Sequence, residues 1–247
     1  MKIKKFFVSA ICIIIALELT FVIHEYGHFR EFQKRNITVE EFSLGIGPLL
    51  YQHKISSCVV SFRLVPIMAY VKPAKENFEL FQKQGKAWDK IVVSTAGIRD
   101  NILVGLAIIF SFQFVGWREG CLSSREFIRT MLFTPIKIFL RFFSFIIGCL
   151  TFGRVNLTEK FLVSTGKINQ PLLLGNLIVM NIGFSFVNII PVYPLDGGYV
   201  AEAIMSSIGG LASIPKIPGY ASFFVFILFL ITANSQDYRI MECQSSN

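Results

Sequence analysis

The sequence is poor in charged residues, in histidine and in paired cysteines. Charged residues make up 16% of the 247 residues and hydrophobic residues 53%, which excludes an ordinary soluble domain. The five cysteines are far apart and form no Cys-x-x-Cys pair, so neither a disulfide framework nor a thiolate metal site is expected. The net charge of +8 comes from scattered Lys and Arg without a nucleic-acid-binding motif. We therefore expect contact with membrane lipid and no nucleic acid partner.

Long apolar runs predict an α-helical polytopic membrane protein. Four segments approach the roughly 20 residues that a helix needs to cross a bilayer, and they cover residues 6–28, 91–116, 171–191 and 219–233. The first segment follows three lysines, as in a signal peptide, but it lacks a small-residue cleavage site and is expected to remain as a spanning helix. We expect residues 1–247 to form a single integral-membrane domain.

The loop between the first two predicted spans is strongly basic. Ten Lys and Arg residues lie between Arg30 and Lys90, so the positive-inside rule places this loop in the cytoplasm. Within it, Glu41–Gly47 and Cys58–Val65 alternate between apolar and polar residues, which predicts two strands around a turn. We expect a small membrane-associated β-hairpin after the first helix.

Residues 131–152 are long and apolar enough to span, but Lys137 and Arg141 lie four residues apart on one helical face. This pattern favours an interfacial amphipathic helix before the third span, with a re-entrant segment as the alternative. If the segment spanned, Asp196 and His24 would emerge on opposite sides of the membrane and could not share a metal. The metal hypothesis and the four-span topology therefore depend on each other.

The first predicted span ends in His24-Glu25-Tyr26-Gly27-His28, a His-Glu-x-x-His motif. Its two histidines fall one helical turn apart and can bind one Zn²⁺ at about 2.0–2.1 Å. Glu25 is placed to take a proton from metal-bound water. Two His and a Glu buried in an apolar helix would cost several kcal/mol unless they had partners, which favours a site over a polar helix end at the headgroups.

A catalytic zinc needs a third protein ligand. His53 lies beside Lys54 in the polar loop and is expected to be solvated. Asp196 follows the third predicted span in a turn rich in Pro and Gly, which could bring its carboxylate inward, although a plain loop cap is the alternative.

Asn181, Ser185 and Asn188 form a polar stripe along one face of the third predicted span. The stripe has two interpretations, interhelical hydrogen bonding and a role in holding the substrate backbone or an oxyanion.

Together these residues resemble the site-2 protease family of intramembrane zinc metalloproteases, and within it the bacterial regulator-of-sigma-E protease subgroup. The similarity rests on the His-Glu-x-x-His motif, on Asn188-x-x-Pro191-x-x-Pro194-Leu195-Asp196-Gly197-Gly198, and on Phe42–Pro48, Ala96-Gly97, Asn101 and residues 234–239. The resemblance implies that His24, His28 and Asp196 bind zinc and that Glu25 is the catalytic base. It also implies substrate contacts for Asn188 and for Tyr70 in the substrate-facing strand, and the polar stripe adds Asn181 as a further candidate.

The family cleaves single-span membrane proteins within or next to their helix, so the resemblance implies a substrate such as an anti-sigma factor or a signal-peptide remnant. It further implies a bacterial inner membrane, and the basic loop places the active site toward the cytoplasm. Residues 116–130 are too few to hold the PDZ domains of close relatives. Met68-Ala69 and Ile98-Arg99-Asp100 also depart from the family pattern. The alternatives are a catalytically inactive relative that binds membrane proteins and, less favoured, a small transporter.

Overall fold

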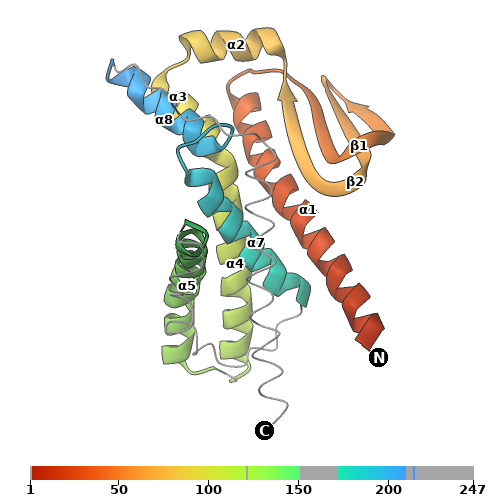
Figure 1. Ribbon diagram of the computed structural model, residues 1–247, viewed down its shortest axis with the longest axis vertical. Helices are drawn as coiled ribbons and strands as arrows, with labels where there is room; N and C mark the ends of the chain where they lie inside the picture. Colours follow the sequence, from red (N-terminus) through yellow and green to blue (C-terminus); the bar gives the residue numbers. More distant parts are fainter. Residues whose placement is uncertain (1, 121, 151–171, 210–213, 215–247) are drawn as a thin grey trace. The chain divides into compact units, whose positions relative to one another are not determined.

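The computed structural model describes residues 2–120, 122–150, 172–209 and 214 (Figure 1). The chain divides into two compact units. The first contains residues up to Ile108 together with Gln170–Lys216, and the second contains Ile109–Asn169 and the residues from Ile217 onward.

The first unit is built on the long helix α1, Lys2–Lys34. Residues at three- and four-residue spacing, among them Leu17, Phe21 and His24, form its buried face. This face packs on helix α7, Leu172–Ile189, where the rings of Phe21 and Phe184 lie 4.7 Å apart. Helix α1 ends where Asn36 adopts a left-handed conformation with φ of 55°, which turns the chain toward the sheet.

The strands β1, Val39–Ile55, and β2, Cys58–Pro73, form an antiparallel hairpin. Both strands bend, so that residues 41–44 of β1 pair with residues 59–62 and also with residues 69–72 of β2. The two strands predicted at 41–47 and 58–65 are confirmed, and each is longer than expected. The hairpin encloses a small core with α1 and α3, made of Phe32, Ile37, Val39, Phe42, Cys58 and Val93.

Three helices follow the hairpin: α2, Lys75–Gln84; α3, Ala87–Ser94; and α4, Ala96–Arg118. Thr95 separates α3 from α4, so the long apolar helix begins a turn later than the predicted residue 91. Helix α8, Asp196–Ser207, contacts α3 and α7 and completes the described part of the first unit.

The second unit contains the end of α4 and helix α5, Ser124–Leu150. Helix α5 starts before the predicted residue 131 because Ser123 and Glu126 form a capping box: the Ser123 hydroxyl accepts from the Glu126 N–H at 3.2 Å, and the Glu126 carboxylate accepts from the Ser123 N–H at 2.9 Å. Residues 119–123 alone connect α4 to α5, which leaves no room for a PDZ domain there. The interfacial position expected for residues 131–152 stays a prediction.

Two described helical segments, Ala10–Lys34 and Ala96–Arg118, are long and apolar enough to cross a membrane. Leu173–Ile189 is apolar but shorter, and the fourth predicted span, residues 219–233, lies outside the described residues. The prediction of a mostly helical chain with a small antiparallel sheet is thus confirmed, whereas the count of four spans stays a prediction.

Candidate metal centre

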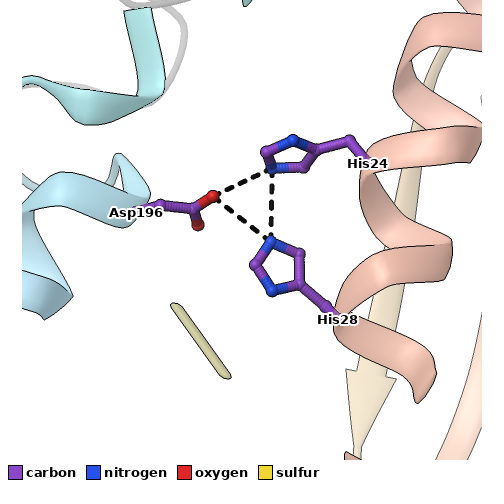
Figure 2. A group of neighbouring side chains, drawn as sticks. All are labelled: His24, His28 and Asp196. Carbon is purple, nitrogen blue, oxygen red and sulfur yellow. Dashed lines mark hydrogen bonds and ion pairs between the residues drawn. The ribbon is translucent and has the colours of Figure 1, made fainter. Parts of the chain in front are cut away.

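Two histidines from α1 and one aspartate from α8 meet at a single point (Figure 2). The Nε2 atoms of His24 and His28 are 3.2 Å apart, and they lie 3.1 and 3.3 Å from Asp196 Oδ2. These three atoms form a nearly equilateral triangle, although Asp196 is separated from the histidines by most of the chain. The structure therefore brings together the three residues predicted from the sequence as metal ligands.

The size of this triangle fits a tetrahedral zinc. Ligand bonds of 2.0–2.1 Å in a tetrahedron put neighbouring ligand atoms about 3.3 Å apart, close to the three distances observed. Asp196 Oδ2 is buried, and its close polar neighbours among the described residues are the two histidine nitrogens. Two imidazole nitrogens, one carboxylate oxygen and an open fourth position make up a catalytic type of zinc site.

A tight turn delivers Asp196 to the histidines. A Cβ atom on Gly197 would lie 2.3 Å from the Ile189 carbonyl oxygen, and one on Gly198 would lie 2.9 Å from the Tyr193 nitrogen. Side chains at these two positions would therefore push α8 away from the end of α7. This close approach explains why glycine occupies both positions after Asp196.

The charge of Asp196 suits a metal ligand. Burial by itself would raise the pKa of this carboxyl, but the positive charges that His28 and His24 carry when protonated lower the pKa below its ordinary range. The carboxylate is therefore ionised at neutral pH, which is the form that binds a cation.

Each histidine is held from its far side by a second group. His28 Nδ1 lies 2.9 Å from the Val93 carbonyl oxygen, which can only accept, so Nδ1 carries a proton. In the neutral ring Nε2, which faces Asp196, is then the nitrogen that can bind a metal. His24 Nδ1 lies 3.3 Å from the Asn101 side-chain amide. The amide oxygen of Asn101 is buried and unpaired among the described residues, and turning the amide over presents it to His24 as an acceptor. Sequence reasoning assigned no role to Val93 or Asn101.

Helices α1 and α4 cross at two glycines beside the histidines. A Cβ atom on Gly97 would lie 2.6 Å from the His24 ring, and one on Gly27 would lie 2.6 Å from the Ala96 carbonyl oxygen. The absence of side chains at Gly27 and Gly97 lets the start of α4 support the His24 ring directly.

Glu25 lies one residue after the first histidine and points to the hairpin. Its Oε2 accepts a hydrogen bond of 3.1 Å from the Val71 N–H of β2. Since the described sheet has two strands, residues 69–73 of β2 pair with β1 along one edge and turn the other edge toward Glu25. The hairpin thus orients the predicted base.

The remaining predicted residues lie elsewhere. Asn181 donates to Thr20 on α1 at 3.2 Å, and Ser185 donates to the Ile98 carbonyl of α4 at 3.2 Å, so both join helices.

Asn188 is buried and donates to the Phe184 carbonyl within α7 at 3.1 Å. The Tyr70 ring lies 5.7 Å from the guanidinium of Arg63 within the hairpin. The substrate-binding roles assigned to Asn181, Asn188 and Tyr70 stay predictions. His53 is exposed on β1 and takes no part in the metal group.

An ion-pair cluster that the sequence did not predict surrounds the end of α1. The buried Glu31 contacts Lys34, Arg35 and Arg99 at 3.0, 2.6 and 3.2 Å. Arg99 also pairs with Asp100 at 3.0 Å. Asp100 in turn pairs with Arg30 of α1 at 2.5 Å, so Arg99 and Asp100 both join α4 to α1 close to His28.

Comparison with known proteins gave one family and several relatives. The model of peptidase family M50 matches residues 12–232. Over 101 residues the chain is 29% identical to "Putative zinc metalloprotease FN1322" of Fusobacterium nucleatum, which covers 39% of this chain and 30% of the relative. Over 112 residues it is 31% identical to "Membrane metalloprotease ARASP, chloroplastic" of Arabidopsis thaliana, and these residues are 42% of this chain and 25% of the relative. A relative from Clostridium acetobutylicum, "Putative zinc metalloprotease CA_C1796", is 31% identical over 119 residues, which are 46% of this chain and 34% of the relative. The chain therefore spans about a third or less of the length of these relatives.

Proposed function

The chain belongs to peptidase family M50, and from this premise we propose that it is a zinc-dependent intramembrane endopeptidase. One observation carries the proposal: the triangle of His24, His28 and Asp196 has the dimensions of a zinc site, and the motif that supplies its histidines also supplies Glu25. The names of the relatives, which include zinc and membrane metalloproteases, support the same metal and reaction.

In the proposed mechanism His24, His28 and Asp196 hold the metal, and the proton moves through Glu25. When bound, zinc would lower the pKa of a water molecule and polarise the scissile carbonyl. Glu25 takes the proton from the attacking water and passes it to the leaving amine nitrogen. The Val71 N–H holds the carboxylate of Glu25 in place, so the base is oriented before substrate arrives.

The substrate is proposed to be the helix of a single-span membrane protein. A peptide bond inside a helix has its carbonyl engaged by the backbone, so the helix must unwind before water can attack it. An unwound segment has exposed N–H and C=O groups, and the edge of β2 at residues 69–73 lies beside Glu25 with groups to receive them. Asn188, Tyr70 and Asn181 remain candidate substrate contacts.

The site is proposed to face the cytoplasmic side of a bacterial inner membrane. The candidate span Ala10–Lys34 ends just beyond His28, and the segment that follows carries the excess of Lys and Arg. An anti-sigma factor or a signal-peptide remnant fits this location as substrate.

Cleavage of a model single-span substrate in detergent tests the proposal. The wild-type protein should cut the substrate, a chelator should stop the reaction, and added zinc should restore it. Glu25→Gln should not cut, whereas Glu76→Gln, the same change at an exposed glutamate of α2, should cut like the wild type. Equal cleavage by wild type and Glu25→Gln would exclude the mechanism. An inactive wild type that binds the substrate would instead favour a membrane-protein binder.

A further inference from the structure

Glu18 is an acidic residue inside the candidate span Ala10–Lys34 that the proposed mechanism does not use. Both of its carboxylate oxygens are buried, and the groups near them among the described residues are two backbone amides, neither of which completes a well-formed hydrogen bond. Acidic side chains are rare inside membrane spans because an unpartnered charge there is costly, and they usually mark a functional contact. The hydrogen-bonding capacity of Glu18 therefore needs an explanation.

Glu18 lies on the same side of α1 as Glu25. The two residues are seven positions apart, which is nearly two helical turns and about 10 Å along the axis. Both face the hairpin: Glu25 accepts from the Val71 N–H, and Glu18 lies close to the backbone amides of Gly45 and Met68. From Met68 to Val71 a strand also advances about 10 Å. Residues 68–71 of β2 therefore run alongside α1 from Glu18 to Glu25.

An extended substrate that follows this part of β2 to the metal centre must pass Glu18. At about 3.3 Å per residue, the substrate side chain beside Glu18 is about three residues from the scissile bond. A carboxylate offers about four acceptor positions, so the two neighbouring amides leave capacity for a further donor. In surroundings of low dielectric, a cationic partner offsets the cost of the buried charge far better than an apolar side chain.

We propose that Glu18 forms an acidic subsite that selects a Lys or Arg side chain of the substrate about three residues from the cleaved bond. The subsite rests on the proposed function, because it assumes a peptide that lies along β2 with its scissile bond at the metal. It names a substrate feature, a basic residue close to the cleavage point inside an apolar helix, that the metal ligands and Glu25 leave open.

The test uses a set of single-span substrates that differ only in the position of one lysine. The lysine replaces a leucine at each of the positions on both sides of the cleaved bond, and the all-leucine substrate is the reference. For each enzyme the measured quantity is the ratio of kcat/KM for a lysine substrate to kcat/KM for the reference. Wild type, Glu18→Gln and Glu18→Lys are compared, and a further substrate carries glutamate at the preferred position.

The wild type should favour lysine at one position by about tenfold, which is about 1.4 kcal/mol. In Glu18→Gln this ratio should fall to about one, and Glu18→Lys should favour the glutamate substrate instead. A purely structural Glu18 would lower kcat/KM for all substrates by the same factor and leave the ratio unchanged. That result would overturn the proposal, as would a wild type without any preference for lysine.

A binding measurement separates failure of this proposal from failure of the proposed function. In the Glu25→Gln background, the Kd ratio of the lysine and leucine substrates is measured with and without Glu18→Gln. The subsite predicts tighter binding of the lysine substrate that is lost with Glu18, even when no enzyme cuts. An equal Kd ratio with and without Glu18→Gln would refute the subsite and leave the proposed protease function standing.

Discussion

Replacing Asn101 by alanine should weaken zinc binding without touching any metal ligand. Asn101 is fully buried, and its side-chain amide is the group that faces Nδ1 of His24, at 3.3 Å. For Nε2 of His24 to bind a metal, Nδ1 must keep its proton, and that N–H needs an acceptor. Without Asn101 the N–H is buried with no partner in place.

The magnitude follows from the cost of an unpaired buried donor, about 1–3 kcal/mol. Since 1.4 kcal/mol corresponds to a tenfold change, the Kd for zinc should rise by roughly 5- to 150-fold. Substitutions of such outer partners in other metal sites cost about 10–100-fold in affinity, which is the same range. His28 gives an internal comparison, because its partner is the Val93 backbone carbonyl, which no side-chain substitution removes.

The assay is competition for zinc with a chelator of known affinity, performed on detergent-solubilised protein. Asn176→Ala is the matched control, since Asn176 is also a buried asparagine but lies on α7 and is not among the described residues that hydrogen-bond with the histidines. Asn101→Asp should bind zinc at least as well as Asn101→Ala, because a carboxylate oxygen can accept from Nδ1. If Asn101→Ala and Asn176→Ala bound zinc with the affinity of the wild type, the assigned role of Asn101 would be refuted.

Three further substitutions test neighbouring contacts. Gly97→Ala places a Cβ atom 2.6 Å from the His24 ring, so chelator competition should show weaker zinc binding; unchanged affinity would contradict the close crossing of α1 and α4. Glu31→Gln removes a buried charge that faces three cations and should lower the free energy of unfolding by about 1–3 kcal/mol, measured by denaturant titration; no loss would mean that the cluster is not stabilising. Burial raises the pKa of Glu41, but its hydrogen bonds, led by the one from Arg63, outweigh burial, so the net effect is a lowered pKa. The stabilisation from these hydrogen bonds is therefore present at neutral pH and is lost as the pH falls below about 4 and through the lowered pKa. Arg63→Met should therefore be less stable than wild type at pH 7, and thermal unfolding should show the difference shrinking in acid; a constant difference would contradict the ion pair.

The local parts of the site could be predicted from the sequence. A spacing of four residues on one helix places His24 and His28 on the same face whatever the rest of the chain does. Alternation of apolar and polar residues likewise indicated the hairpin, although not its bends, because residues 41–44 pair with two separate parts of β2.

The parts that depend on how helices meet could not be predicted in this way. The contact of Asp196 with the histidines had a resemblance as its main support, because the turn after α7, taken by itself, favoured a loop cap over a metal ligand. Val93 and Asn101 reach the histidines only because α1 crosses the α3–α4 junction at two glycines, and the sequence does not give that crossing. The sequence shows Glu18 as a carboxylate inside an apolar segment, but only the structure places it beside the hairpin.

The zinc content of the purified protein and of two variants bears most directly on the metal site. The wild type should hold about one zinc per chain, Asp196→Ala should lose zinc, and His53→Ala, which removes an exposed histidine of the hairpin, should keep its full zinc content. A wild type without zinc, an Asp196→Ala protein that keeps its zinc with unchanged affinity, or a His53→Ala protein that loses it would contradict the assignment of His24, His28 and Asp196 as the ligands.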